Sequence, residues 1–247
     1  MFEKKIKFIT HPAFLNEPQE LPKPIKFNLP DWYKKLKHKP EFKNIKGCIP
    51  FFDALTFGYV LPVPQDFVIK HNFTNKDKDG KEFQDSGFKC PYNHDFPTIN
   101  LNSMRKEIPD IHPTFQLEGS PLIEKNKNLA FYKIINPWII QTPPGYSCLF
   151  VPPLNNEDDR FSIISGIVDT DTFNKEVNFP IVINGDKYPT LETVIKKGTP
   201  YVQVIPFKRD NWKMEIETKK NKDLLSLYPL RLINTYKLDF WRKKKCN

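Results

Sequence analysis

The sequence predicts a mainly β protein, a single barrel or sandwich of the jelly-roll type with an N-terminal extended arm and a short C-terminal helix. Proline makes up 24 of the 247 residues, roughly twice its average share, and a helix interior does not tolerate it. Alanine, the best helix former, occurs only three times, whereas phenylalanine occurs 21 times and favours strands. After residue 129, turn residues interrupt short apolar segments about every ten residues, a spacing typical of sandwiches and jelly rolls.

Residues 1–45 predict a proline-rich arm that carries one short helix. Five prolines lie between residues 10 and 31 and favour an extended strap, because proline fixes φ and lacks an N–H donor. Residues 31–36 then permit a short helix with Asp31 as its N-cap. Trp32 and Leu36 are four residues apart and would share one helix face. We expect that face to plug into the body of the protein.

Residues 46–222 predict the mainly β core domain. Residues 48–55 are consistent with a helical turn, and residues 58–64 predict an edge strand because their prolines cannot donate ladder hydrogen bonds. Residues 66–73 alternate in part and predict a second strand, which would pair with the first as a hairpin. Residues 74–110 are the least hydrophobic stretch and predict a turn and a long loop or insertion.

Six core strands are predicted in the remainder of this domain. Pro143 to Gly145 would form the turn before one of them, Gly198 would supply a positive φ before the last, and Trp138 would anchor the core. The predicted strands span residues 130–135, 146–151, 161–168, 178–183, 193–196 and 201–208.

Residues 223–247 predict an amphipathic helix with a basic end. After Pro229, Leu232, Ile233, Tyr236 and Phe240 follow the spacing of one helix face. We expect this helix to dock, either on its own barrel or on another subunit.

The charge of the chain invites a nucleic-acid interpretation that its distribution argues against. The net charge is +9 and the pI about 9.2, but only five residues are arginine and the lysines are scattered. Residues 34–39 and 242–245 are the two local basic runs that could bind a polyanion. No stretch approaches the roughly 20 apolar residues of a membrane span, and the N-terminus lacks a signal-peptide core. We therefore expect a protein that is neither secreted nor bound to a membrane or to nucleic acid.

The sequence predicts free thiols, no metal and no cofactor. Cys48, Cys90, Cys148 and Cys246 are far apart and form no CxxC pair. Cys90 and His94 could share a zinc ion with His71 or His112, but the spacing of these residues does not specify a complete set of four ligands. Residues 77–80 resemble part of a calcium loop that lacks its glutamate, so a plain turn is the better interpretation.

Four sequence blocks follow one another along the core domain: Asn136-Pro137-Trp138, Pro143-Pro144-Gly145-Tyr146-Ser147, Gly166-Ile167-Val168-Asp169-Thr170-Asp171 and Lys197-Gly198-Thr199-Pro200 with Gln203. These blocks resemble an uncharacterised protein family of tailed phages, algal viruses and some bacteria. The family has no known activity, so the resemblance implies a viral origin, a single fold and a location in the host cytoplasm or the virion. With that origin, the surfaces on which residues 223–247 would dock include a virion component.

The same order of blocks is also similar to the β-clip family of trimeric dUTPases and dCTP deaminases. That resemblance places Asp169 at the carboxylate that activates water in the family. The family's phosphate-binding Arg-Ser-Ser block, however, falls on residues 152–155, which offer neither a cation nor hydroxyl groups. The resemblance therefore implies a β-clip-like barrel as the alternative to a jelly roll, with most of the catalytic machinery missing.

Six polar or aromatic residues beside apolar strands form the candidate ligand site. If they converge on one cavity, that cavity is the default binding site; otherwise they serve loops and strand edges. We predict a virus-encoded non-enzymatic binding protein, virion-associated or accessory in the infected cell, whose partner is another protein or a second copy. The alternative is a β-clip protein that binds a nucleotide or small molecule. The six residues are Asp169, Asp171, Asn155, Gln203, Arg209 and Tyr146.

Overall fold

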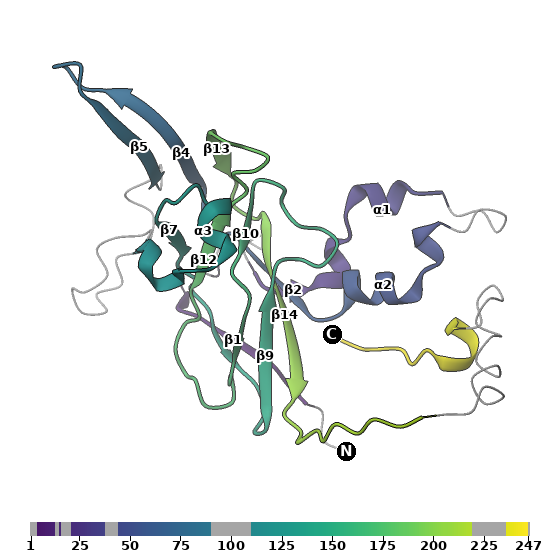
Figure 1. The fold of residues 1–247 in the computed structure, drawn as a ribbon. Coiled ribbons are helices and arrows are strands. Elements are labelled where there is room, and N and C mark those ends of the chain that lie inside the picture. The colour runs from purple at the N-terminus through teal and green to yellow at the C-terminus, as the bar shows by residue number, and fades with distance from the viewer. Residues whose placement is uncertain are drawn as a thin grey trace.

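The structure is a computed structural model that describes residues 4–12, 15, 21–37, 44–89, 110–218 and 236–246. Over these residues the fold is mainly β, as predicted (Figure 1). None of the described helices is long and apolar enough to cross a membrane. The strands are β1 (Lys7–Ile9), β2 (Lys23–Pro24), β3 (Tyr59–Pro62), β4 (Phe67–Lys76), β5 (Glu82–Lys89), β6 (Asp110–His112), β7 (Phe131–Ile134), β8 (Ile139–Gln141), β9 (Tyr146–Val151), β10 (Phe161–Ile163), β11 (Gly166–Val168), β12 (Phe179–Ile183), β13 (Leu191–Ile195) and β14 (Pro200–Lys208). The helical segments are the α-helices α1 (Asp31–Lys35), α2 (Ile49–Thr56) and α3 (Pro121–Lys125), the 3-10 turns η3 (Ile25–Asn28), η4 (Ile45–Gly47) and η5 (Thr114–Leu117), and the π-helical turn η7 (Tyr236–Phe240).

The strands pair in four antiparallel sheets within the described part of the chain. The largest sheet has the order β11-β9-β14-β3-β2, and the second has the order β10-β12-β7-β6. Strand β4 lies between β13 and β5 in a third sheet, and β1 pairs with β8 in a fourth. None of these sheets closes into a barrel among the described residues. The mainly β class is confirmed, and the jelly-roll or β-clip topology stays a prediction.

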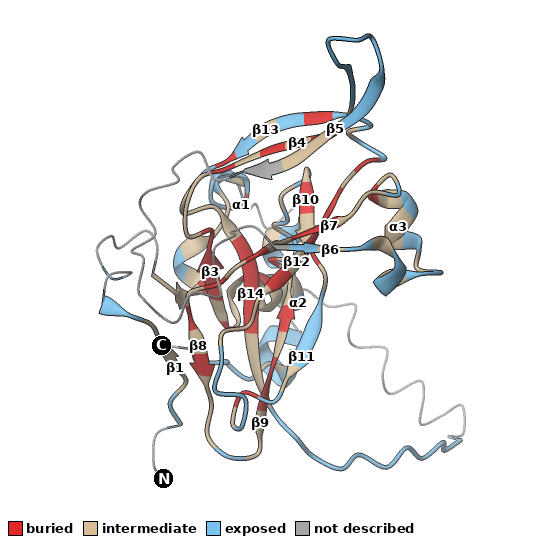
Figure 2. Cartoon of the chain, turned by 90° about the vertical axis from the view of Figure 1, so that its left-hand side faces the viewer, coloured by how far each residue is buried: buried red, intermediate tan, exposed pale blue. Residues whose placement is uncertain are grey.

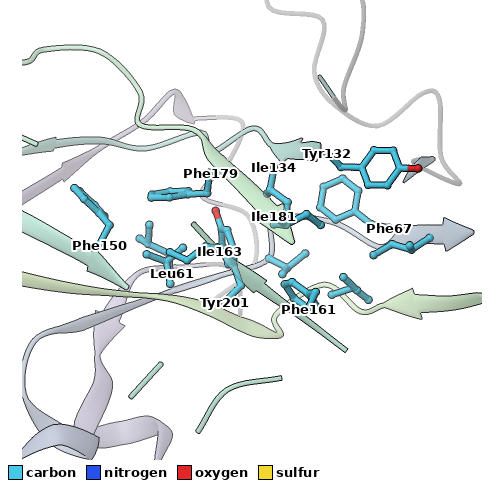
Figure 3. Close-up of a cluster of buried hydrophobic side chains, with 14 of the residues drawn as sticks. Leu61, Phe67, Tyr132, Ile134, Phe150, Phe161, Ile163, Phe179, Ile181 and Tyr201 are labelled. Carbon is cyan, nitrogen blue, oxygen red and sulfur yellow. The ribbon is translucent and has the colours of Figure 1, made fainter. Parts of the chain in front are cut away.

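One hydrophobic core is shared by the two largest sheets. The ring of Phe179 on β12 lies 5.4 Å from that of Phe150 on β9 and 5.7 Å from that of Tyr201 on β14, between ring centroids (Figure 3). Burial concentrates on β9, β12 and β14, whereas the tip of the β4–β5 hairpin is exposed (Figure 2). Trp138, the predicted anchor, belongs to this buried cluster. Each fully buried large apolar side chain contributes about 1.5–3 kcal/mol of transfer free energy.

The predicted core strands are found with one correction. β9 has the predicted bounds, and β7, β12, β13 and β14 lie within two residues of theirs. The predicted strand 161–168 is two strands in different sheets, since β10 pairs with β12 and β11 pairs with β9. The chain changes sheet at Ile164, whose N–H donates to the carbonyl of Pro180. A continuous apolar run does not reveal such a change of partner.

Residues 74–89 form a β-hairpin, which corrects the predicted loop over this part of residues 74–110. The carboxylate of Asp77 accepts the N–H groups of Asp79 and Lys81 at 2.9 and 2.8 Å and closes the turn between β4 and β5. The hairpin predicted between residues 58–64 and 66–73 is also wrong, because β3 pairs with β14 and β2 while β4 pairs with β13 and β5. The exposed ends of β4 and β5 show little alternation of apolar and polar residues, so the hydrophobic pattern of the sequence did not predict them as strands. Residues 90–109, with Cys90 and His94, lie outside the described residues.

The short N-terminal helix is present as α1, but its cap and buried face differ from the prediction. Pro30 occupies the N-cap and Asp31 is the first helical residue. Tyr33 is the buried residue, and its ring stacks on Phe51 and Phe52 of α2, whereas Trp32 is 47% exposed. Aromatic packing against α2 therefore determines the face that α1 presents.

Most of the predicted C-terminal helix, residues 223–247, lies outside the described residues. The described part is the turn η7 followed by residues 241–246, which are not helical. The side chains of Trp241 and Lys244 bind the carboxylate of Asp53 on α2. The end of the chain thus docks on its own α2.

Candidate functional site

The six predicted site residues divide into two groups along β9 and β14. At one end of this strand pair Lys208 lies opposite Tyr146, and at the other end Gln203 lies opposite Val151. The side chains of Asp169, Asp171 and Arg209 gather at the first end, and Asn155 belongs to the loop that Gln203 contacts at the second. Five residues of strand span about 17 Å. The six residues therefore do not line one cavity.

Three strand ends bring the first group together. Residues 169–171 follow β11, which pairs with β9, so they lie beside the start of β9. Arg209 follows β14, which pairs with β9 on its other side. The main-chain N–H of Arg209 donates to the carbonyl of Gly145 at 2.8 Å and ties the end of β14 to the turn before β9. We call Asp169, Asp171, Arg209 and Ser147 the strand-end cluster.

The polar groups of the strand-end cluster bind one another. Arg209 Nη1 donates to Asp171 Oδ1 at 2.8 Å, and Nη2 binds Asp171 Oδ2. Asp171 Oδ2 also accepts the N–H of Gly145 at 2.8 Å. Ser147 Oγ donates to Asp169 Oδ1 at 2.7 Å and accepts from Arg209 Nη1 at 3.1 Å. The bonds connect the turn before β9, the loop after β11 and the end of β14.

The electrostatics of the strand-end cluster favour a structural role. The guanidinium of Arg209, followed by the N–H of Gly145, lowers the pKa of Asp171 to about 2. The hydroxyl of Ser147, followed by Arg209, lowers the pKa of Asp169. A general base works best with a pKa near the operating pH, so Asp169 is a weak base here. Two carboxylates also outnumber the one guanidinium, which disfavours a bound phosphate.

Tyr146 reaches the strand-end cluster through its main chain, and its side chain points to the N-terminal arm. Its carbonyl accepts from Arg209 Nη1 at 3.5 Å and from Thr142 Oγ1 at 3.1 Å, and its hydroxyl contacts Lys4 Nζ. Tyr146 therefore links β9 to the start of the described chain.

Gln203 and Asn155 hold main-chain segments in place. Gln203 is fully buried, and its amide nitrogen donates to the carbonyls of Ala54 and Phe57 at 3.0 and 2.7 Å. Its amide oxygen accepts the N–H of Leu154 at 2.8 Å. Asn155 has a φ of +59°, a left-handed conformation that asparagine tolerates in turns. Gln203 thus joins α2, β14 and the loop after β9.

The histidines considered as metal ligands do not meet in the described part of the chain. No group of three or more His, Cys, Asp or Glu residues is arranged to hold a metal ion among the described residues. His112 Nδ1 lies 2.6 Å from Gln116 Oε1. His71 is fully buried on β4 with its ring edge-on to Tyr132 and near the backbone of Asn126, and neither ring nitrogen meets the geometry of a hydrogen bond with another described residue. His71 is therefore a core residue.

We expect acidification from pH 6.5 to pH 4 to lower the free energy of unfolding by about 3 kcal/mol through His71. Burial lowers the pKa of His71 from 6.5 to about 4, so in this range the unfolded chain binds a proton that the folded chain does not. The stability that neutral His71 confers is complete above pH 6.5 and is lost as the pH falls toward 4.

Urea denaturation at several pH values measures this effect. His71→Leu should reduce the loss of stability on acidification, and His11→Leu at an exposed position should not. An unchanged pH dependence in His71→Leu would contradict the assignment.

Two features of the structure were not found as sites from the sequence. Residues 211–218 leave the end of β14 with large apolar side chains exposed. The alternation of apolar and charged residues in this segment was a usable strand signal. The basic residues of the C-terminal tail line a cavity against α2. The sequence analysis identified residues 242–245 as a basic run but did not predict that this run packs against α2.

No protein-family model matches this chain, and no curated protein matches it. The resemblance to the viral family and the weaker one to the β-clip family stay predictions.

Proposed function

We propose that this protein is a non-enzymatic binding protein that associates with a second copy of itself through an exposed strand-like arm. The arm is the segment 211–218, which follows β14 and Arg209 and leaves the body of the molecule at the lower end of β14 (Figure 1). The observation that carries the proposal is the exposure of its apolar side chains.

The arm has the residue pattern of a strand that lacks a partner. Trp212, Met214 and Ile216 alternate with one lysine and two glutamates, so the apolar side chains would share one face of a strand. Their exposed fractions are 90%, 84% and 83%. Contiguous exposed apolar groups of this size are typical of protein interaction sites. Pairing of the arm with a sheet edge would bury these three side chains.

The strand-end cluster supports this function because it determines where the arm begins. Arg209 is the residue that precedes the arm by two positions, and Asp171, Ser147 and Gly145 hold both its side chain and its main chain. The charged groups of the strand-end cluster bind one another, so they are better suited to fixing the position of the arm than to catalysing a reaction. The same neutralisation gives little support to the alternative of a nucleotide bound at Asp169.

The partner is a second copy because each chain has both parts that strand addition needs. These parts are the arm, which lacks a paired strand, and the outer edge of β11, to which a strand can be added. Among the described strands, β11 is the outer one of the largest sheet, and it exposes Ile167 at 64% of its surface. An open edge with an exposed aliphatic residue accepts an added strand. Reciprocal exchange of two arms across a two-fold axis would bury both arms and both edges, and two-fold symmetry is the commonest symmetry of homo-oligomers.

We expect the wild-type chain to be a dimer at about 10 µM and the triple variant Trp212→Ser/Met214→Ser/Ile216→Ser to be a monomer. The substitutions remove the apolar face of the arm and should leave the melting temperature of the monomer unchanged, because these side chains are almost fully exposed among the described residues. Light scattering coupled to size-exclusion chromatography measures the mass.

The control variant Lys213→Ser/Glu215→Ser/Glu217→Ser changes the other face of the same arm and should remain a dimer. A monomeric wild-type chain, or a dimeric apolar-face variant, would overturn the proposal.

The finer fold and the biological setting belong to the same proposal. Two main sheets around one core support a jelly-roll or β-clip-like arrangement. The sequence blocks around Trp138 and Asp169 support a viral origin, with the protein either in the virion or accessory in the infected cell. Mass spectrometry of purified particles distinguishes these two settings.

A further inference from the structure

A cavity of about 360 Å³ lies between α2 and the C-terminal tail, residues 241–246. Phe52, Asp53 and Thr56 of α2 form one wall, and Lys26 of η3 extends it. The tail forms the other wall, with Trp241 and three consecutive lysines. Neither the strand-end cluster nor the exposed arm contributes to this cavity, so it is independent of the proposed dimer contact.

The tail is held against α2 at defined points. Trp241 Nε1 donates to Asp53 Oδ2 at 3.0 Å, and Lys244 Nζ binds the same oxygen at 2.6 Å. The carboxylate of Asp53 is only 15% exposed. Cys246, at the end of the described tail, is half-buried beside the backbone of Gly58. These contacts keep the basic residues of the tail over α2.

The cavity carries a surplus of positive charge. Lys26, Lys243, Lys244 and Lys245 line it together with one carboxylate, that of Asp53. That carboxylate already forms an ion pair with Lys244. Lys243 and Lys245 are exposed and form no ion pair with any other described residue. Positive charges that line one cavity repel one another, and a bound multivalent anion would relieve the repulsion.

We infer that this cavity binds the phosphate chain of a small polyphosphate ligand. Lysine ammonium groups are common phosphate ligands, and several around one cavity match a chain of phosphates better than a single carboxylate. A volume of about 360 Å³ is at the lower end of the range for small-molecule sites. The rings of Trp241 and Phe52 add an aromatic wall on which a nucleobase can stack. The chemistry is shared by nucleoside triphosphates and inorganic polyphosphate.

Calorimetric titration of the full chain with tripolyphosphate and with adenosine triphosphate tests the inference. Saturable binding of tripolyphosphate is expected, with an affinity that falls as salt rises. The variant Lys243→Ala/Lys245→Ala should bind about tenfold more weakly, because it removes two ammonium groups and keeps the Lys244 anchor. The control Lys78→Ala/Lys81→Ala removes the same charge from the exposed β4–β5 turn and should bind normally.

The titrations distinguish a nucleoside triphosphate from inorganic polyphosphate as the ligand. They also include results that would overturn the inference. Tighter binding of adenosine triphosphate than of tripolyphosphate supports a nucleotide, and equal binding supports inorganic polyphosphate. The inference is overturned if neither ligand saturates, or if the control variant loses as much affinity as the cavity variant. It is also overturned if a single-stranded oligonucleotide binds and tripolyphosphate does not displace it.

Discussion

Gln203→Glu is expected to lower the free energy of unfolding by about 4 kcal/mol at neutral pH. The amide nitrogen of Gln203 donates to the carbonyls of Ala54 and Phe57, and the site is fully buried. A glutamate would turn an oxygen toward those carbonyl oxygens and would lose both hydrogen bonds. The β14 strand would then lose its connection to α2.

The pH dependence of this variant follows from the same geometry. Burial beside two carbonyl oxygens would raise the pKa of the new carboxyl group above its unfolded value of about 4.3. A raised folded pKa contributes stability below the unfolded pKa and loses it as the pH rises, so the variant should be least destabilised near pH 4.

Urea denaturation at pH 4 and pH 7 measures both effects. Gln84→Glu makes the same chemical change at an exposed position and should cost less than about 0.5 kcal/mol. Gln203→Met should show a loss that does not depend on pH, since it removes the hydrogen bonds without adding a charge. Equal losses for Gln203→Glu and Gln84→Glu would show that the buried amide is not needed.

Gly58→Ala is expected to lower the free energy of unfolding by about 3 kcal/mol or more. Gly58 connects α2 to β3 with a φ of +92°, and a Cβ atom there would lie well inside van der Waals contact with the carbonyl oxygen of Val204. That oxygen belongs to the backbone of the central strand β14, so no side-chain rotation can relieve the contact. The β3–β14 pairing at Tyr59 and Val204 would have to shift.

The matched control for this variant is Gly80→Ala in the β4–β5 turn. Gly80 has a φ of +78°, but no atom lies within 4 Å of the position that a Cβ atom would occupy there. It should therefore show only the cost of the backbone conformation, about 1 kcal/mol. Thermal and urea denaturation measure the difference between the two variants. A Gly58→Ala variant as stable as Gly80→Ala would contradict the close approach of β3 and β14.

The strands of the core were predictable because their signals are local. β9 and β14 are apolar runs rich in β-branched and aromatic residues, and turn residues precede both. The positive φ of Gly198 is also found as predicted. The β4–β5 hairpin was missed because its exposed tip needs no apolar face, and the break between β10 and β11 was missed because both halves are short and apolar.

The candidate site could be predicted only in part. The loop after β11 and the end of β14 were recognised as polar, and Asp169, Asp171 and Arg209 do lie together. The sequence could not show that Arg209 is already neutralised by its own neighbours. Nor could it place Gln203, whose partners on α2 are almost 150 residues earlier in the chain.

The amino-acid sequence by itself determined that this is a mainly β protein, and where most of its core strands lie. The chain has little alanine, much proline and many aromatic residues. Each residue type has its own preference for helix or strand, so these preferences predict the secondary-structure class without knowledge of the fold. Only the tertiary structure decided which strands pair, which charges Arg209 meets and that the tail returns to Asp53. Those contacts join residues far apart in the chain, and they depend on the burial of all the sheets together.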